Sequence, residues 1–129
     1  MIRYLQRQLV CWIAKSQIGK SDATKYWNGL LNPPYPQSWC GAFCLWCFHK
    51  IGIAKEGWVV SKGFLYRYPT TTTPQKGDVA YFTKYQHQAM IVGVNGDTLT
   101  LVNGNGNGGK VTLGTCKLKD ASGFYNVIG

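Results

Sequence analysis

Acidic residues are scarce in this sequence. Its 129 residues include 5 Asp and Glu against 14 Lys and Arg, which gives a formal net charge of +9. A field of this sign attracts polyanions such as nucleic acid, anionic lipid headgroups or the acidic polymers of a bacterial envelope. The basic residues are scattered and form no tract, whereas nucleic-acid modules concentrate them on one helix or loop. We therefore expect a polyanionic partner that is not nucleic acid.

Long apolar runs are also missing. The stretch Leu9-Val10-Cys11-Trp12-Ile13-Ala14 is too short to span a membrane and has no signal-peptide cleavage site after it. We expect a protein that is made in the cytoplasm without a Sec signal and is not stably inserted in a membrane. The five cysteines are an odd number in a chain large enough to fold without crosslinks, so no disulfide framework is indicated.

Helical spacing dominates the first part of the chain. Residues 4–18 place Leu5, Leu9, Trp12, Ile13 and Ser16 at helical intervals. The connector 19–38 is rich in Pro, Asn and Gly, with a short helical turn expected around 22–30. Ser38 is a suitable N-cap for a second helix over 39–51, which has an apolar face that we expect to be buried.

The second half has the pattern of antiparallel strands. We predict strands at 79–82, 88–94, 98–102, 110–113 and 124–128, and Asn95-Gly96-Asp97 is a hairpin signal. The threonine run 70–73 is assigned to an irregular connection. Helices first and a meander of strands afterwards is the pattern of an α+β domain.

Cys40 is the candidate nucleophile. It lies on the first turn of the second predicted helix, where unpaired N–H groups and the positive end of the helix dipole stabilise a thiolate. The spacing of an iron–sulfur site is matched by Cys40, Cys44 and Cys47. Such clusters use cysteines on a loop, however, whereas these three recur on one face of a predicted helix among aromatic residues, which is typical of core residues. No second Cys or His pair completes a zinc site, so we expect no metal.

A cysteine nucleophile needs a base and a group that orients it. The sequence has two histidines, and His49 is about 13 Å along the helix from Cys40, too far to reach the sulfur. His87, at the start of an apolar strand, is therefore the expected base. Asn103, at the end of the next strand, can accept the Nδ1–H of His87, although Asn103, Asn105 and Asn107 can also be turn formers in an Asn-Gly loop.

Four ordered segments carry a family resemblance. Residues 38–43 resemble the W-C-[AG]-x-F motif of CHAP domains, the cysteine, histidine-dependent amidohydrolase/peptidase members of the NlpC/P60 and papain-like group. Residues 76–82 resemble their K-G-D-[IV]-x-x-[FW] strand. Residues 87–92 resemble H-V-[AG]-[IV]-V, with Gln88 in place of valine. Residues 103–105 resemble E-G-N, with Asn103 in place of glutamate.

The resemblance implies a papain-like fold and a single CHAP-like catalytic domain over 1–129, without a separate cell-wall-binding domain. It implies hydrolysis of a peptidoglycan amide bond, either between muramic acid and L-alanine or within the stem or cross-bridge peptide, and no cofactor. On matching positions Cys40 is the nucleophile, His87 the base and then the acid, and Asn103 the orienting residue. Asn105 takes the second polar position and is the alternative orienting residue.

Further residues are expected around this site. The Cys40 backbone N–H is one oxyanion donor, and Gln37 or Ser38 is the second. Trp39 and Tyr35, beside the nucleophile, are the best candidates to line a substrate groove.

The implied setting is that of a phage lysin or an injected antibacterial effector. Such a protein acts on peptidoglycan in the periplasm or cell wall after holin-mediated release or injection, is expected to be a monomer, and as an effector has an immunity or inhibitor protein as partner. The alternative is a catalytically silent module that binds peptidoglycan with the same fold.

Overall fold

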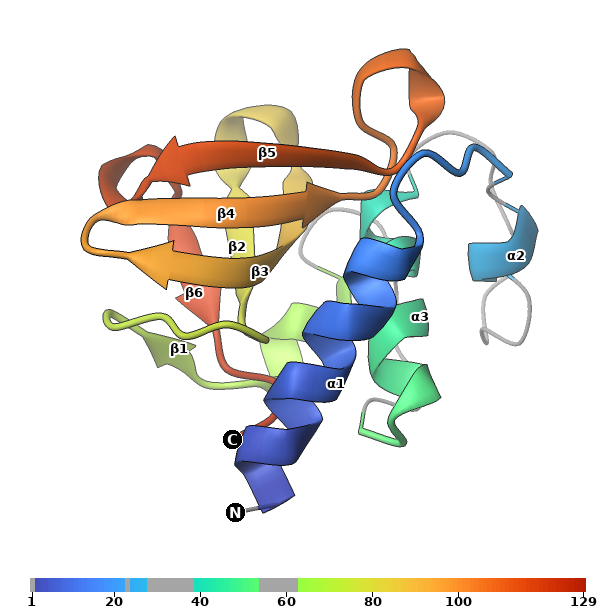
Figure 1. The fold of residues 1–129 in the computed structure, drawn as a ribbon. Helices are drawn as coiled ribbons and strands as arrows, with labels where there is room; N and C mark the ends of the chain where they lie inside the picture. Colours follow the sequence, from blue (N-terminus) through green and yellow to red (C-terminus); the bar gives the residue numbers. More distant parts are fainter. Residues whose placement is uncertain (1, 23, 28–38, 54–62) are drawn as a thin grey trace.

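The computed structural model describes residues 2–22, 24–27, 39–53 and 63–129 (Figure 1). Over these ranges the chain forms three α-helices, short 3-10 helices (η) and one antiparallel sheet. The elements are, in chain order, α1 (Ile2–Ser16), α2 (Thr24–Trp27), α3 (Cys40–Lys50), η1 (Gly63–Arg67), β1 (Thr70–Thr71), β2 (Val79–Phe82), η2 (Thr83–Tyr85), β3 (His87–Asn95), β4 (Thr98–Asn103), η3 (Asn107–Gly109), β5 (Thr112–Lys117), η4 (Leu118–Asp120) and β6 (Gly123–Tyr125).

The sheet follows the order β1-β6-β2-β3-β4-β5, and every neighbouring pair is antiparallel. The predicted α+β class, with helices packed on an antiparallel sheet, is confirmed. The β3–β4 hairpin closes at the predicted turn, where Asn95 pairs with Thr98 and Gly96 has a φ of +62°, which suits glycine. None of the helices within the described ranges is long and apolar enough to cross a membrane.

Two predicted strands are shifted by contacts that strand patterns do not encode. Residue 111 was predicted to be in a strand, but the Val111 amide donates to the Lys20 carbonyl and its carbonyl accepts from Gly19. These bonds tie Val111 to the segment after α1, so β5 begins at Thr112, two residues later than predicted. The last strand, predicted at 124–128, ends at Tyr125, and the threonine run contributes a strand, β1, that pairs with it.

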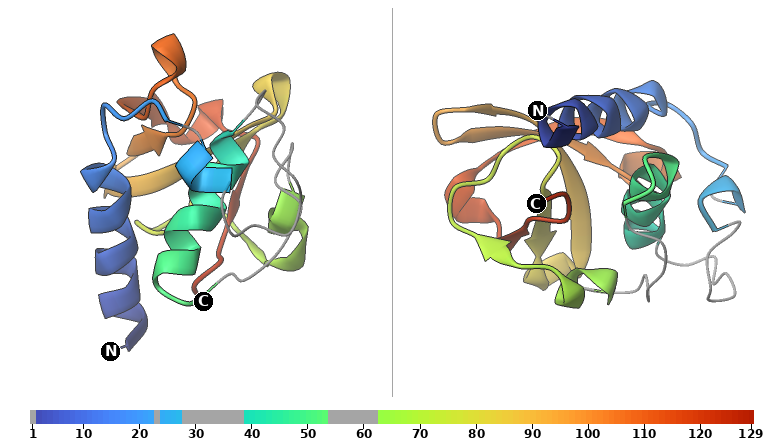
Figure 2. Two further views of the ribbon diagram at one scale, coloured as in Figure 1. Left: turned by 90° about the vertical axis from the view of Figure 1, so that its right-hand side faces the viewer. Right: turned by 90° about the horizontal axis from the view of Figure 1, so that it is seen from below.

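Helix α3 is the centre of the helical half. It contacts α1, α2 and β3, and Figure 2 shows the three helices gathered beside the curved sheet. Phe43 and Phe48 of α3 are fully buried against Val79, Met90 and other residues on one face of the sheet. The opposite face has its own apolar cluster: Ala80, Ala89, Ile91, Leu99, Leu101 and Phe124.

The start of α3 differs slightly from the prediction. The helix begins at Cys40, so the N-cap position is occupied by Trp39, which makes no capping hydrogen bond with its side chain. Ser38, the predicted N-cap, lies outside the described residues. The helix end at Lys50, before Gly52, agrees with the sequence pattern to within a residue.

Helix α1 has the predicted location but an unexpected orientation. Its buried residues are Arg7, Val10, Cys11 and Ala14. The larger apolar residues Ile2, Leu5, Leu9 and Trp12, here called the apolar stripe, are 46–70% exposed. At 100° per residue the centres of these two faces are about 170° apart, so the stripe points away from the core.

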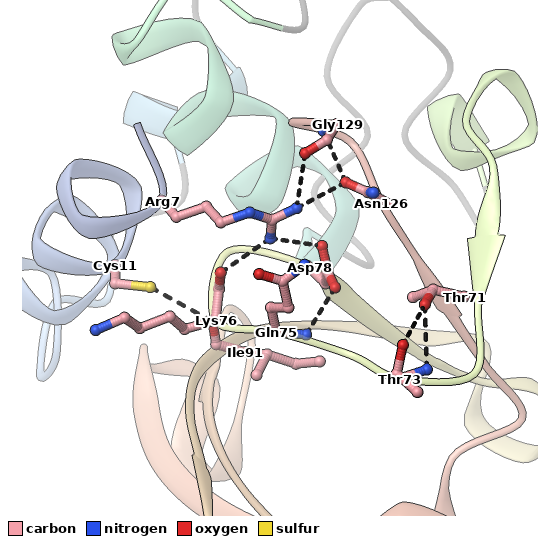
Figure 3. Close-up of polar contacts among 10 residues, drawn as sticks. All are labelled: Arg7, Cys11, Thr71, Thr73, Gln75, Lys76, Asp78, Ile91, Asn126 and Gly129. Carbon is pink, nitrogen blue, oxygen red and sulfur yellow. Dashed lines mark hydrogen bonds and ion pairs between the residues drawn. The ribbon is translucent and has the colours of Figure 1, made fainter. Parts of the chain in front are cut away.

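A buried ion pair explains this orientation (Figure 3). Arg7 Nη1 donates to Asp78 Oδ1 at 2.8 Å and to the Lys76 carbonyl at 3.0 Å, and both side chains of the pair are buried. Arg7 Nη2 donates to Asn126 Oδ1 and to the Gly129 carbonyl. Asp78 Oδ2 accepts from the Gln75 amide. The pair therefore links α1 to the turn before β2 and to the segment after β6.

Replacement of Asp78 by Ala should lower the free energy of unfolding by about 3–5 kcal/mol, because the Arg7 charge would remain buried without its partner. Urea unfolding followed by circular dichroism measures this loss. The exposed pair Lys117–Asp97, 3.5 Å apart with side chains 52% and 72% exposed, provides the control. Asp97→Ala should cost about 0–1 kcal/mol, and equal losses in the two variants would contradict the assignment.

Candidate active site

Three elements that are distant in sequence bring Cys40, His87 and Asn103 together. Cys40 is the first residue of α3, His87 the first of β3 and Asn103 the last of β4. Because β3 and β4 are antiparallel neighbours, the start of one and the end of the other lie at the same edge of the sheet. Helix α3 packs on β3, and its N-terminus meets that edge.

His87 and Asn103 are joined directly. His87 Nε2 and Asn103 Oδ1 are 2.8 Å apart, a hydrogen-bond distance at which the ring nitrogen donates. The predicted partnership is therefore present, but the prediction that Asn103 binds Nδ1 is wrong. The preceding strand residues Leu99 and Leu101 are buried on the same face, as the alternation of β4 requires.

The Cys40 thiol lies against the imidazole. It forms a side-chain hydrogen bond with His87, and since Nε2 is bound to Asn103, Nδ1 is the nitrogen left for the thiol. Burial alone would lower the pKa of His87. The hydrogen bond and charge interaction with Cys40, together with the hydrogen bond to Asn103, outweigh burial and raise this pKa above 6.5. The contact with Cys40 therefore favours the protonated form of the His87 ring.

Gln86 is a further site residue that the sequence did not indicate. Its backbone is left-handed, with a φ of 48°, which is uncommon for a residue other than glycine. This turn precedes His87 and directs the Gln86 carbonyl toward Cys40, whose Sγ is 3.9 Å from the oxygen. The K-G-D strand contributes Phe82, which pairs with His87 across the sheet, with ring centroids 6.0 Å apart.

Gly104 allows β4 to approach α3 closely. A Cβ at this position would be 2.4 Å from Cβ of Phe43, which is fully buried in α3. The glycine after Asn103 is therefore required for contact with the helix that carries Cys40. Asn105 has a left-handed φ of 57°, and its predicted role as second polar residue stays a prediction.

The residues predicted to surround the catalytic side chains are not all found at the site. Trp39 is 4% exposed, and its ring stacks on Tyr26 with centroids 5.3 Å apart and an interplanar angle of 9°. It packs in the core, so the prediction that it lines the substrate groove is wrong. The partner is Tyr26 of α2, which the sequence placed in a connector. Tyr35 and Gln37 lie outside the described residues.

Cys11, Cys44 and Cys47 have no comparable setting. Cys44 and Cys47 are fully buried, and burial raises the pKa of each thiol well above 9. Burial also raises the pKa of Cys11 to about 11. Such thiols are poor nucleophiles at neutral pH. In the part of the chain that the structure describes, no three His, Cys, Asp or Glu residues cluster in a way that could hold a metal ion.

A pocket of about 230 Å³ opens beside His87 and Asn103. Leu101 of β4 and Gly114 and Cys116 of β5 form one side, while Phe82 and Tyr85 contribute to the other. Gly114 pairs with Leu101 and has no side chain to fill this space. Apart from His87, the lining residues have uncharged side chains.

The fold and these three side chains define a papain-like α+β protein with a cysteine at the start of its central helix. The CHAP domain family model matches residues 31–105, which is more than half of the chain. The chain therefore belongs to the CHAP domain family.

Solved structures share the fold. The P60 domain of antigen MAP1204 from M. avium subspecies paratuberculosis has a TM-score of 0.70 and 17% identity, over 99% of this chain and 98% of that one. The peptidoglycan hydrolase RipB from Mycobacterium tuberculosis has a TM-score of 0.69 and 15% sequence identity, over 98% of this chain and 67% of that one. Ly7917 has a TM-score of 0.61 and 16% sequence identity, over 95% of this chain and 62% of that one. No curated protein sequence matches the chain.

Gly104→Ala should destabilise the protein by about 1–3 kcal/mol, because the new methyl group overlaps Phe43 and neither the helix nor the strand can move without repacking the core. Thermal and urea unfolding measure the change. Gly123→Ala is the control, since its Cβ would have no neighbour closer than 3.8 Å. Equal stability of Gly104→Ala and the wild type would contradict the close approach of β4 to α3.

The pKa of His87 should fall in Cys40→Ala. This variant lacks the hydrogen bond and the charge interaction with Cys40 that raise the pKa, while burial, which lowers the pKa, remains. NMR titration of the His87 ring protons measures the change, and His49→Gln, which removes the second histidine, assigns the signals. An unchanged or higher pKa in Cys40→Ala would show that the thiol does not interact with the ring.

Proposed function

We propose that this protein is a cysteine hydrolase that cleaves an amide bond of bacterial peptidoglycan. The observation that carries the proposal is the continuous contact from the Cys40 thiol through the His87 ring to the Asn103 amide oxygen. Membership of the CHAP family supports it. Further support comes from the similar fold of the peptidoglycan hydrolase RipB, and of Ly7917, whose structure is also known with the hydrolyzing product of MDP.

In the first step His87 Nδ1 accepts the proton of the Cys40 thiol, and the thiolate attacks the carbonyl carbon of the scissile amide. Negative charge develops on the carbonyl oxygen. Cys40 is the first residue of α3, at the positive end of the helix dipole, which stabilises negative charge on this oxygen.

In the second step the His87 imidazolium donates its proton to the amide nitrogen, the C–N bond breaks, and the amine leaves. The acyl group remains on Cys40 as a thioester. His87 then accepts a proton from water, the hydroxide attacks the thioester carbonyl, and the C–S bond breaks to release a carboxylic acid. Throughout, Asn103 is a positioning residue that holds Nε2 and keeps Nδ1 toward the sulfur.

The pocket beside His87 suits the amine side of the substrate. The leaving nitrogen must lie within hydrogen-bond reach of the ring that protonates it. Substrate atoms beyond that nitrogen would therefore continue past His87 into the pocket, which is lined by Leu101 and Cys116 among others. Its uncharged walls favour a neutral or alkyl group of the peptide over a carboxylate.

The bond cleaved is either the N-acetylmuramoyl-L-alanine amide or a peptide bond in the stem or cross-bridge. Cleavage of either would weaken the wall and lyse the cell. We propose that the protein acts in the periplasm or cell wall, as a phage lysin or an injected effector would.

Cys40→Ala and His87→Ala should each lower the release of fragments from purified peptidoglycan sacculi by about 10³-fold or more, because each removes a group that acts in bond cleavage. Mass spectrometry of the released fragments measures activity and identifies the bond. His49→Gln is the control for loss of a histidine.

Two results would contradict the proposal. Undiminished release by Cys40→Ala would exclude thioester chemistry. Absence of release by the wild type, with equal binding of sacculi by wild type and Cys40→Ala, would identify a catalytically silent binding module.

A further inference from the structure

The apolar stripe of α1 is exposed along the whole helix. Ile2, Leu5, Leu9 and Trp12 are 70%, 57%, 46% and 66% exposed, and they project within an arc of about 80°. Figure 2 shows α1 along the outer edge of the molecule. The Arg7–Asp78 pair fixes the opposite face of the helix in the core, so the stripe cannot turn inward. A contiguous apolar surface of this kind on a folded domain marks an interaction site.

The charges around the stripe have one sign. Helix α1 has no acidic residue, and the first acidic residue of the chain is Asp22. Lys15 is exposed about 60° beyond the Trp12 edge of the stripe, and Trp12, at that edge, is 66% exposed. An apolar helix face bordered by a tryptophan and a lysine, on a helix without acidic residues, is typical of a helix that lies in a membrane interface.

We propose that the apolar stripe docks α1 flat onto an anionic lipid bilayer. The stripe enters the boundary between headgroups and acyl chains, while Lys15 contacts anionic headgroups. The net charge of +9 adds attraction to such a surface. Apolar and electrostatic contacts act together here, and stable peripheral attachment requires two such signals.

A second copy of the chain fits the stripe less well. Positions 2, 5, 9 and 12 have heptad spacing, but they span two heptads, whereas a coiled coil needs at least three or four. Two copies would also bring equal charges of +9 together. Charge therefore favours the lipid surface and opposes self-association.

Vesicle co-sedimentation of the whole chain tests the proposal. The wild type should bind vesicles of equal parts phosphatidylcholine and phosphatidylglycerol and should bind pure phosphatidylcholine vesicles much more weakly. The double variant Leu5→Gln, Trp12→Gln should bind the anionic vesicles at least about tenfold more weakly, because it loses the apolar area that enters the bilayer. Leu113→Gln is the matched control, since Leu113 is 56% exposed on β5 and Leu5 57% on α1.

Both Leu5 and Trp12 are exposed, so the double variant should keep the wild-type circular dichroism spectrum, and the single variant Leu5→Gln provides a milder test. No vesicle binding by the wild type, equal binding by the double variant, or equal binding to neutral vesicles would overturn the proposal. A wild-type dimer in sedimentation equilibrium that the double variant cannot form, without vesicle binding, would assign the stripe to a second copy instead.

Discussion

The buried ion pair between Arg7 and Asp78 is the interaction on which the arrangement of this domain depends. Two charges removed from water are stabilising only when their hydrogen-bonding groups are satisfied, and here the guanidinium also contacts the Lys76 carbonyl, Asn126 and the Gly129 carbonyl. The Asp78 carbonyl accepts from the Ile91 amide where β2 begins to pair with β3. The pair thus connects α1 to the strand that begins with His87.

The same pair decides which face of α1 is buried. The sequence predicts a helix from the spacing of Leu5, Leu9 and Trp12, and periodicity of this kind normally marks the core face. Arg7 has to reach Asp78, however, so the face with Val10 and Ala14 turns inward and the larger apolar residues turn outward. Periodicity predicts the presence of a helix, but its rotation depends on a partner 71 residues away, which no local pattern encodes.

The candidate site was predictable where it depends on local patterns. Cys40 follows from its place at a helix start, and His87 and Asn103 follow from strand ends that meet when two strands are antiparallel. The details that depend on tertiary contacts were not predictable. Which ring nitrogen of His87 faces Asn103 depends on how the turn at Gln86 orients the imidazole. The burial of Trp39 depends on stacking with Tyr26, which lies in a helix of four residues.

The neutral orienting residue has a consequence for the charge of the site. A carboxylate at position 103 would stabilise the imidazolium by itself, whereas the Asn103 amide oxygen supplies a hydrogen bond without a full charge. The opposing charge for His87 then comes from Cys40, whose hydrogen bond and charge interaction are the main contributions that raise the pKa of the ring. In the proposed reaction, thiolate and imidazolium would stabilise each other until acylation of the sulfur removes the thiolate. With the thiolate gone, burial would lower the pKa of His87, and the ring would release its proton more readily to the departing amine.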